Sequence, residues 1–339
     1  VEAEFVNYVP VAGGALKVWQ GWGQSKGFNW KNICKRLIRL RHERASIQKF
    51  EAFRGEHMNR SELIHDRDGF RRVSAKYDAL ISGSDQIWHL DRSPIYFLDT
   101  DSGFTGRKIS YASCSGHLEQ SADRKAEKRA LLCQYDQIAV RNDFTADIVG
   151  DLVGERPIVV ADPTLLADLI EYESELDLPC KDYILLYCLG DEIVGSHAAM
   201  IEEIRNRCGD LPVVAIVASS HKPQHLRGMD QIFYAADPGD WMTLIRNASM
   251  LYTDSYHGVL FALKYGRPVL AYYREAQRSP RMTDLAERYH LQSHIVECVD
   301  TAKQIEGWEA PADTKTMQAI EAHVQVSKKY LNNALLPVS

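Results

Sequence analysis

The sequence has no hydrophobic run long enough to cross a membrane. Its longest apolar stretches, such as Pro212–Ser219 and Pro268–Tyr273, have the length of single β-strands. A membrane-spanning helix needs a run of about 18 mostly apolar residues or more. The sequence therefore predicts a chain without a membrane-spanning segment.

Paired cysteines are also missing. The chain has seven cysteines, an odd number, and no two of them form a C-x-x-C pair. This spacing argues against a disulfide framework and against a structural zinc site. We expect free thiols, in keeping with a reducing compartment.

The charge balance shows no basic excess. The 40 Lys and Arg residues are outnumbered by 46 Asp and Glu residues, which leaves a net charge of −6. A protein that binds a nucleic-acid backbone usually carries a clear surplus of cations. We therefore expect no nucleic acid among the partners.

Sequence motifs of several common enzyme classes are missing as well. The sequence contains no G-x-x-x-x-G-K-[ST] loop and no G-x-S-x-G motif. Gly21, Gly23 and Gly27 resemble a dinucleotide-binding loop, but the last spacing is off by one and no clear strand precedes them. A P-loop nucleotidase, an α/β-hydrolase and a dinucleotide-dependent enzyme are therefore not expected.

Patterns of buried strands alternate with patterns of helices through the 339 residues. The strands are continuous apolar runs, typical of parallel strands that helices cover on both faces. The expected strands are Tyr77–Ser82, Lys108–Ala112, Gln137–Val140, Pro157–Ala161, Tyr183–Leu189, Val213–Ala218, Gln231–Tyr234, Leu251–Thr253, Val269–Tyr273 and Ile295–Val299.

This rhythm predicts an α/β fold of two Rossmann-like, doubly wound domains. We expect residues 1–170 to form the first domain and residues 171–312 the second, with the boundary in the acidic connector Asp168–Lys181. Residues 313–339 are expected to form a C-terminal helix that could pack back across both domains.

Polar residues that directly follow the expected strands are the candidates for a site, because ligands of open parallel sheets bind beyond the carboxyl ends of the strands. The candidates of this kind are Ser84, Asp85, Gln86, Ser113, Arg141, Asp162, Ser255, His257 and Gly258.

Each main candidate has a functional and a purely structural interpretation. His257 lies where a strand meets a helix, so it could transfer protons near a bound anion or only satisfy local backbone. Arg141 could bind an oxyanion through its planar guanidinium or form an ion pair with an aspartate. Asp85 could accept a hydrogen bond from a substrate hydroxyl or cap a short helix. Asp162, which precedes Pro163, is mainly a turn signal.

Five motifs in order resemble the polysaccharide pyruvyl transferase family. They are Ile81-Ser82-Gly83-Ser84-Asp85-Gln86-Ile87-Trp88, Ile109-Ser110-Tyr111-Ala112-Ser113, Val140-Arg141, Ala161-Asp162-Pro163-Thr164-Leu165-Leu166, and Thr253-Asp254-Ser255-Tyr256-His257-Gly258 followed by Gly266-Arg267-Pro268. The resemblance extends from about Phe5 to Tyr289. It implies two Rossmann-like lobes that face a cleft, as in GT-B glycosyltransferases.

The resemblance also implies an activity, namely transfer of the pyruvyl group of phosphoenolpyruvate to two hydroxyls of one sugar, with a ketal as product. It implies no metal and no cofactor, with His257 as general acid and base and Arg141 as the oxyanion-binding residue. The second domain would hold phosphoenolpyruvate and the first the acceptor. Ser255, Gly258, Arg278 and Arg281 would contribute to donor binding, while Ser84, Asp85, Gln86 and Ser113 would contact the acceptor or line its site.

The implied setting is the assembly of a bacterial exopolysaccharide or cell-wall glycan in the cytoplasm, with peripheral contact at the inner membrane face where the acceptor is lipid-linked. Family members begin with a strand and a loop before the segment that matches Glu2–Pro10. We therefore expect that Val1 is not the natural start and that the first domain lacks its first strand.

Two other functions remain open from the sequence. One is a GT-B-like glycosyltransferase that uses a nucleotide sugar, whose donor would bind at the same helix N-terminus near His257. The other is a catalytically silent, glycan-binding relative of the family. A response to a nucleoside diphosphate rather than to phosphoenolpyruvate would favour the first, and binding without turnover would favour the second.

Overall fold

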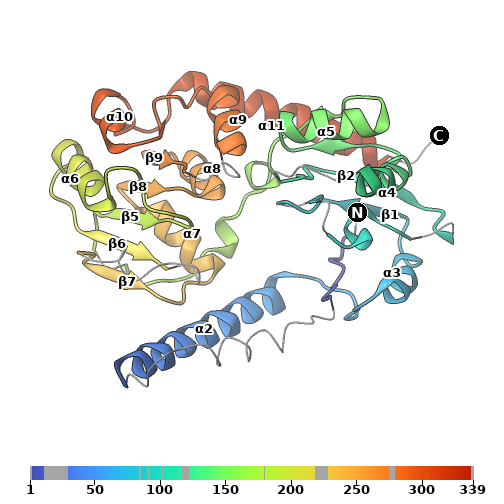
Figure 1. Cartoon of the computed structure of the whole chain (residues 1–339), viewed down its shortest axis with the longest axis horizontal. Helices are drawn as coiled ribbons and strands as arrows, with labels where there is room; N and C mark the ends of the chain where they lie inside the picture. The colour runs from blue at the N-terminus through green and yellow to red at the C-terminus, as the bar shows by residue number, and fades with distance from the viewer. Residues whose placement is uncertain are drawn as a thin grey trace.

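The computed structural model shows an α/β protein with parallel strands in both halves of the chain (Figure 1). The structure describes residues 2–10, 30–83, 85–89, 92–100, 103–116, 122–178, 180–217, 228–274 and 279–336.

The C-terminal half contains a six-stranded parallel sheet. Its strands are β5 (Ile184–Tyr187), β6 (Val213–Ile216), β7 (Gln231–Phe233), β8 (Met250–Thr253), β9 (Val269–Tyr272) and β10 (Ile295–Val296). Their order in the sheet is β10-β9-β8-β5-β6-β7. This is the order of a doubly wound fold, in which the direction of winding reverses between the first and fourth strands, here β5 and β8.

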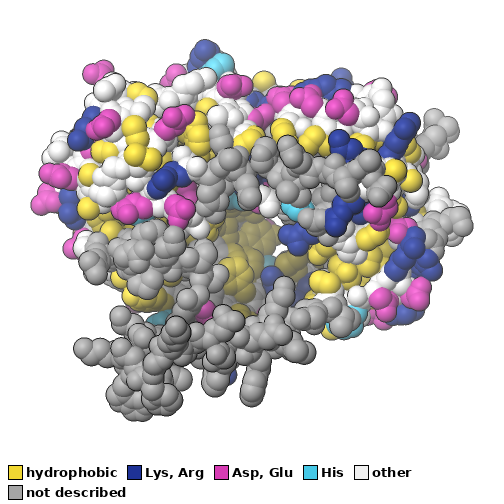
Figure 2. All heavy atoms as spheres, in the orientation of Figure 1, with side chains coloured by type: hydrophobic (Ala, Val, Ile, Leu, Met, Phe, Trp, Pro, Cys, Tyr) yellow, Lys and Arg dark blue, Asp and Glu magenta, His cyan; other side chains and the backbone are white. Residues whose placement is uncertain are grey.

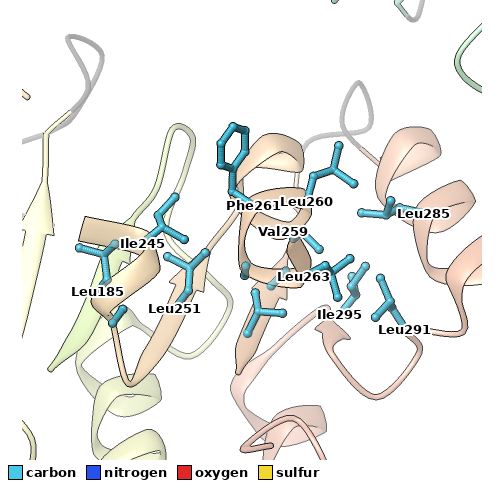
Figure 3. Packing of buried hydrophobic residues seen from close by; sticks show 14 of the residues in the cluster. Leu185, Ile245, Leu251, Val259, Leu260, Phe261, Leu263, Leu285, Leu291 and Ile295 are labelled. Atoms are coloured by element: carbon cyan, nitrogen blue, oxygen red, sulfur yellow. The ribbon is translucent and has the colours of Figure 1, made fainter. Parts of the chain in front are cut away.

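Both faces of this sheet are buried, as the continuous apolar strands predict. Leu185 and Leu251 belong to the hydrophobic layer on one face, while Leu186 and Tyr252 belong to the layer on the other. Figure 3 shows the first layer, where strand residues meet Val259 and neighbouring side chains of the covering helices. Alternate residues of each strand thus pack against helices on opposite faces of the sheet.

The N-terminal half contains shorter parallel strands. They are β1 (Ala79–Ser82), β2 (Arg107–Ser110), β3 (Ala139–Val140) and β4 (Ile158–Val159). β1 pairs with β2 and β3 pairs with β4, each in parallel. Single parallel bridges at Ile109–Gln137 and Ser113–Val140 join the two pairs. The carboxyl ends of β1 to β4 therefore face the same way.

Helices connect and cover these strands. Their bounds are α2 (Trp30–His57), α3 (Arg67–Ser74), α4 (Ala122–Leu132), α5 (Asp143–Val153), α6 (His197–Cys208), α7 (Pro238–Asn247), α8 (Tyr256–Lys264), α9 (Ser279–Tyr289), α10 (Val299–Gln304) and α11 (Thr314–Leu335). Three short 3₁₀ helices cover Pro94–Phe97, Pro163–Leu165 and Ile170–Tyr172.

Two of these helices differ from the sequence-based expectation. The sequence pattern marks only a polar connector before the first strand, yet α3 forms there, with Asp66 accepting a hydrogen bond from Gly69 N and with Phe70 and Val73 buried. The strand expected at Ile295–Val299 ends at Val296, because Cys298 caps α10 and Val299 begins it. In both places a side-chain cap sets the helix start, and hydrophobic periodicity alone does not reveal such a cap.

Helix α11 contacts both halves of the chain. Its Ser327 hydroxyl accepts a hydrogen bond from Ala161 N (2.8 Å), and its Tyr330 donates to Ser110 O (2.8 Å). Its His323 lies between Val159 O and the hydroxyl of Tyr289 in α9. Figure 1 shows α11 running along the edge of the molecule beside α5 and α9.

Helix α2 also lies against the C-terminal half, although it comes early in the chain. Lys49 forms an ion pair with Asp240 of α7 (2.6 Å), and the rings of Phe53 and His57 contact Tyr172. The chain then returns to the N-terminal half, where Arg60 makes a parallel bridge with Phe5.

Candidate active site

The candidate site lies where the carboxyl ends of the N-terminal strands meet the beginning of α8. Asp85 lies three residues after the end of β1, Arg141 directly follows β3, and Asp162 lies three residues after the end of β4. His257 lies in the first turn of α8, and Arg281 lies in the first turn of α9. Four close contacts between charged side chains link these five residues, so the site contains residues from both halves of the chain.

Arg141 is the centre of this group. Its side chain is 2% exposed, and its two terminal nitrogens donate to different carboxylates, Nη1 to Asp162 Oδ2 (3.1 Å) and Nη2 to Asp85 Oδ1. Its guanidinium carbon lies 4.7 Å from the centre of the Tyr256 ring. Buried Nε has no hydrogen-bond acceptor among the described residues. The pairing with aspartates that the sequence left open is therefore present, and Arg141 still has one unused donor.

Asp162 joins Arg141 to His257. Its Oδ2 lies 3.1 Å from Arg141 Nη1 and 3.5 Å from His257 Nε2. Its Oδ1 accepts hydrogen bonds from Thr164 N (3.0 Å) and Thr164 Oγ1 (2.8 Å). Burial raises the pKa of this carboxyl, but His257, Arg141 and Thr164 outweigh burial and lower the pKa well below its usual range. Asp162 is therefore an ionised carboxylate in a buried place.

Asp85 connects the two arginines of the site. Its Oδ1 accepts from Arg141 Nη2 and from Arg281 Nη1 (2.9 Å). Burial raises its pKa, but the attraction of Arg141 and Arg281 is stronger and lowers the pKa overall. The buried Nε of Arg281 has no hydrogen-bond acceptor among the described residues. The two cations therefore share one anionic oxygen and have donors left for a further acceptor.

The N-terminus of α8 brings His257 to this group. Ser255 caps the helix, because its hydroxyl accepts from Gly258 N (3.2 Å). The amides of Tyr256 and His257, in the first helical turn, have no acceptor within the helix. His257 is 36% exposed in its side chain, so it is accessible as well as paired with Asp162. A helix start with free amides favours an anion beside His257.

Gly258 has a structural reason to be glycine. A Cβ at this position would lie 2.9 Å from Thr253 Oγ1 and 3.2 Å from Ser255 Cβ. Thr253 in turn donates to Tyr187 O and accepts from Ser255 N. The missing side chain therefore lets α8 begin directly against the end of β8, which places His257.

The other residues predicted for the site lie in several environments. Ser113 is buried and donates to Ser82 O (2.9 Å), so its hydroxyl holds β1 and β2 together. Gln86 has a left-handed backbone conformation (φ 49°) next to Asp85. Ser84 and Arg278 lie outside the described residues. Sequence reasoning underrated Asp162 as a turn and did not single out Tyr256; the signal for Asp162 is its position directly after a strand.

Asp254, at the end of β8, occupies the crossover point of the C-terminal sheet. Its carboxylate accepts from Leu189 N (2.5 Å) and Gly190 N (2.7 Å), which follow β5. In dinucleotide-binding folds, the backbone amides after the first strand of the doubly wound order bind phosphates. Here two of these amides are bound by Asp254, so this loop is tied to the neighbouring strand end.

Within the described ranges, no group of three or more His, Cys, Asp or Glu residues has the arrangement of a metal site. Among the described helices, none is both long and apolar enough to cross a membrane. Figure 2 shows that one face of the molecule is hollowed near its centre, where Lys or Arg and His side chains border hydrophobic ones.

Solved structures support the fold class. The UDP-GlcNAc 2-epimerase of Methanocaldococcus jannaschii is similar over 78% of this chain and 78% of its own length, with a TM-score of 0.50 and 11% sequence identity. A putative UDP-N-acetylglucosamine 2-epimerase of Listeria monocytogenes is similar over 79% of this chain and 78% of its own length, with a TM-score of 0.50 and 13% identity. The predicted fold of Rossmann-like, GT-B-like lobes is confirmed.

Sequence comparisons define the family. A search of curated proteins finds no significant match. The family model described as polysaccharide pyruvyl transferase matches residues 18–275, which is most of the chain and includes Asp85, Arg141, Asp162 and His257. This chain therefore belongs to the polysaccharide pyruvyl transferase family, a family of transferases.

Proposed function

We propose that the protein transfers the pyruvyl group of phosphoenolpyruvate to two hydroxyls of one sugar and forms a cyclic ketal. The observation that carries the proposal is the ionic chain Arg281–Asp85–Arg141–Asp162–His257 beside the start of α8. It combines two cations that have unused donors with an accessible imidazole. A small, highly charged anion and a proton-transfer step need this combination.

The arginines have the geometry to hold the donor. Phosphoenolpyruvate carries a phosphate and a carboxylate, and planar guanidinium groups suit both. Arg141 is held under the Tyr256 ring, while Arg281 comes from the other half of the chain. The amides at the start of α8 add donors for one of the two anionic groups. Donor binding therefore replaces part of the contact that Asp85 makes with both arginines.

His257 would move the protons. In the first step the imidazolium gives a proton to the methylene carbon of phosphoenolpyruvate, and one sugar hydroxyl adds to the neighbouring carbon and releases its proton to the imidazole. In the second step another hydroxyl of the same sugar attacks that carbon, the C–O bond to phosphate breaks, and phosphate leaves with the second hydroxyl proton. The methylene has become a methyl group, and the product is a ketal plus inorganic phosphate.

The acceptor is proposed to be a sugar of a bacterial polysaccharide or cell-wall glycan precursor, either lipid-linked or polymeric, which the protein meets in the cytoplasm or at the inner membrane face. The family supports a sugar acceptor. Asp85 and Gln86 are the proposed contacts for its hydroxyls. The proton transfers of this mechanism need no metal or cofactor.

Binding gives the first test. A thermal-shift titration with phosphoenolpyruvate, with UDP and inorganic phosphate as controls, reports which anion binds the native state. We expect phosphoenolpyruvate to raise the melting temperature, and Arg141→Ala to abolish the shift. Arg205→Ala is the matched control, because Arg205 of α6 pairs with Asp210 and Asp230 instead. A shift with UDP but not with phosphoenolpyruvate would contradict the proposal and favour a nucleotide-sugar transferase.

Turnover gives the second test. Phosphate release from phosphoenolpyruvate, followed by ³¹P NMR with a panel of glycan acceptors, should depend on the acceptor and be lost in His257→Gln while donor binding remains. Binding of glycans without phosphate release by the wild type would contradict transfer and favour a silent glycan-binding protein.

A further inference from the structure

We propose that Asp162 is a positioning residue that orients both Arg141 and His257 through one carboxylate oxygen. The expected effect of Asp162 on catalysis rests on the proposed function, whereas its effect on the tautomer of His257 can be measured without turnover. The sequence places Asp162 among the polar residues that follow expected strands, but indicates mainly a turn before Pro163.

The two carboxylate oxygens of Asp162 contact different groups. Oδ1 is held by the amide and the hydroxyl of Thr164, at 3.0 and 2.8 Å. Oδ2 is thereby directed at Arg141 Nη1 (3.1 Å) and His257 Nε2 (3.5 Å). A carboxylate that is fixed on one side in this way presents its other oxygen in a constant direction.

The backbone before Asp162 is also fixed. Val160 N donates to Val140 O (2.9 Å), Ala161 N donates to Ser327 of α11 (2.8 Å), and Tyr111 donates to Ala161 O (2.8 Å). Strand β3, helix α11 and the segment after β2 therefore hold the two residues that precede the carboxylate. Such support is typical of a group whose position matters for a neighbouring reactive side chain.

Helix capping does not explain this arrangement. Asp66 and Asp313 cap α3 and α11 through their side chains, and both are exposed to solvent. Asp162 caps a short 3₁₀ helix in the same way but is only 3% exposed, and its second oxygen faces an arginine and a histidine. A buried carboxylate is costly unless paired, so the pairing with Arg141 and His257 accounts for its presence here.

The arrangement selects one tautomer of His257. An anionic oxygen 3.5 Å from Nε2 favours the proton of the neutral ring on that nitrogen, which leaves Nδ1 to exchange protons with the substrate. Asp162 itself remains ionised, so it keeps one negative oxygen beside the ring throughout the proton transfers. The same oxygen keeps Arg141 Nη1 in place, so the donor-binding cation and the proton-transfer group keep a constant separation.

The test is the ¹⁵N NMR spectrum of histidine-labelled full-length protein, with His257→Gln used to assign the signal. In the neutral ring of the wild type we expect the Nε2–H tautomer, and in Asp162→Asn a shift toward a mixture of tautomers. The matched control is Asp313→Asn, which changes another capping aspartate and should leave the His257 signal unchanged. If Asp162→Asn does not fold, the tautomer of His257 in the wild type still tests the proposal, because a ring protonated on Nδ1 would overturn it.

The kcat of the variants then distinguishes a positioning role of Asp162 from a role in helix capping alone. For Asp162→Asn we expect a loss of kcat for phosphate release between about 10²- and 10⁴-fold, as for other residues that orient a catalytic histidine. Asp313→Asn should keep kcat. An unchanged His257 spectrum in folded Asp162→Asn would overturn the proposal even if activity fell. If phosphoenolpyruvate is not turned over by the wild type, the proposed function fails, whereas the tautomer result remains valid.

Discussion

Arg281 and Asp85 are 196 positions apart in the sequence, and their side chains form a 2.9 Å ion pair. The same Asp85 oxygen also accepts from Arg141. One carboxylate is thus shared by two cations from the two halves of the chain. An anionic donor that binds these cations has to compete with Asp85, so the ion pair sets how tightly the donor is held.

Arg281 should therefore contribute to donor binding. We predict that Arg281→Gln raises the KM for phosphoenolpyruvate by about 10-fold or more, because a hydrogen bond to a charged group is worth about 1.5–3 kcal/mol. The measurement is a kinetic titration of phosphate release, with Arg205→Gln of α6 as the control. A KM equal to that of the wild type would show that Arg281 pairs with Asp85 but does not bind the donor.

Tyr256 supports Arg141 through its ring. Tyr256→Phe keeps the aromatic face under the guanidinium, so we expect it to retain near wild-type kcat/KM. Tyr256→Leu removes the cation–π contact, which is worth about 0.5–2 kcal/mol, and should lower kcat/KM by about 2- to 30-fold. Equal losses in both variants would instead assign the effect to the hydroxyl group, and no loss in Tyr256→Leu would contradict the role of the ring.

Gly83 allows β1 and β2 to approach each other just before Asp85. A Cβ at this position would lie 2.2 Å from Tyr111 O, a backbone atom that cannot move aside cheaply. We predict that Gly83→Ala lowers the free energy of unfolding by about 2 kcal/mol or more and reduces activity by displacing Asp85.

The control for this prediction is Gly55→Ala. A Cβ at Gly55 in α2 meets nothing within 4 Å. Alanine there should be neutral or stabilising by up to about 1 kcal/mol. Chemical denaturation of both variants measures the difference, and similar stabilities would show that the loop after β1 adapts to a side chain.

His323 should make stability depend on pH. Burial lowers the pKa of this imidazole below its ordinary value of 6.5, although the hydrogen bond to Val159 O works in the opposite direction. Below pH 6.5 His323 binds a proton more readily in the unfolded chain than in the folded protein, so the free energy of unfolding falls as the pH falls. At higher pH the ring is neutral in both states, and this loss of stability is absent.

The measurement compares melting temperatures at pH 7.5 and pH 5.5. His323→Gln should be less stable than the wild type at pH 7.5, because it loses the contacts with Val159 and Tyr289. Its further decrease toward pH 5.5 should be smaller than that of the wild type. His65→Gln, which changes an exposed imidazole, is the control. An equal decrease in His323→Gln and the wild type would refute the prediction.

Much of the fold follows from local sequence patterns. The continuous apolar run Val213–Ala218 predicted a buried parallel strand, which is found as β6 (Val213–Ile216). The C-terminal helix expected within residues 313–339 is found as α11 (Thr314–Leu335). Helix α3 was missed, because its short amphipathic pattern lies among charged residues and its start depends on the Asp66 cap. Local patterns report periodicity well, whereas short elements depend on single side-chain contacts.

For the site, strand and helix patterning is enough to place Asp85, Arg141, Asp162 and His257 at strand ends or helix starts. Their contacts come from packing: Arg281 meets Arg141 on one oxygen of Asp85. Likewise, one oxygen of Asp162 binds Thr164 and the other faces Arg141 and His257. These contacts join residues up to 196 positions apart. Their distances depend on how the two sheets and α11 pack together, which no local pattern encodes.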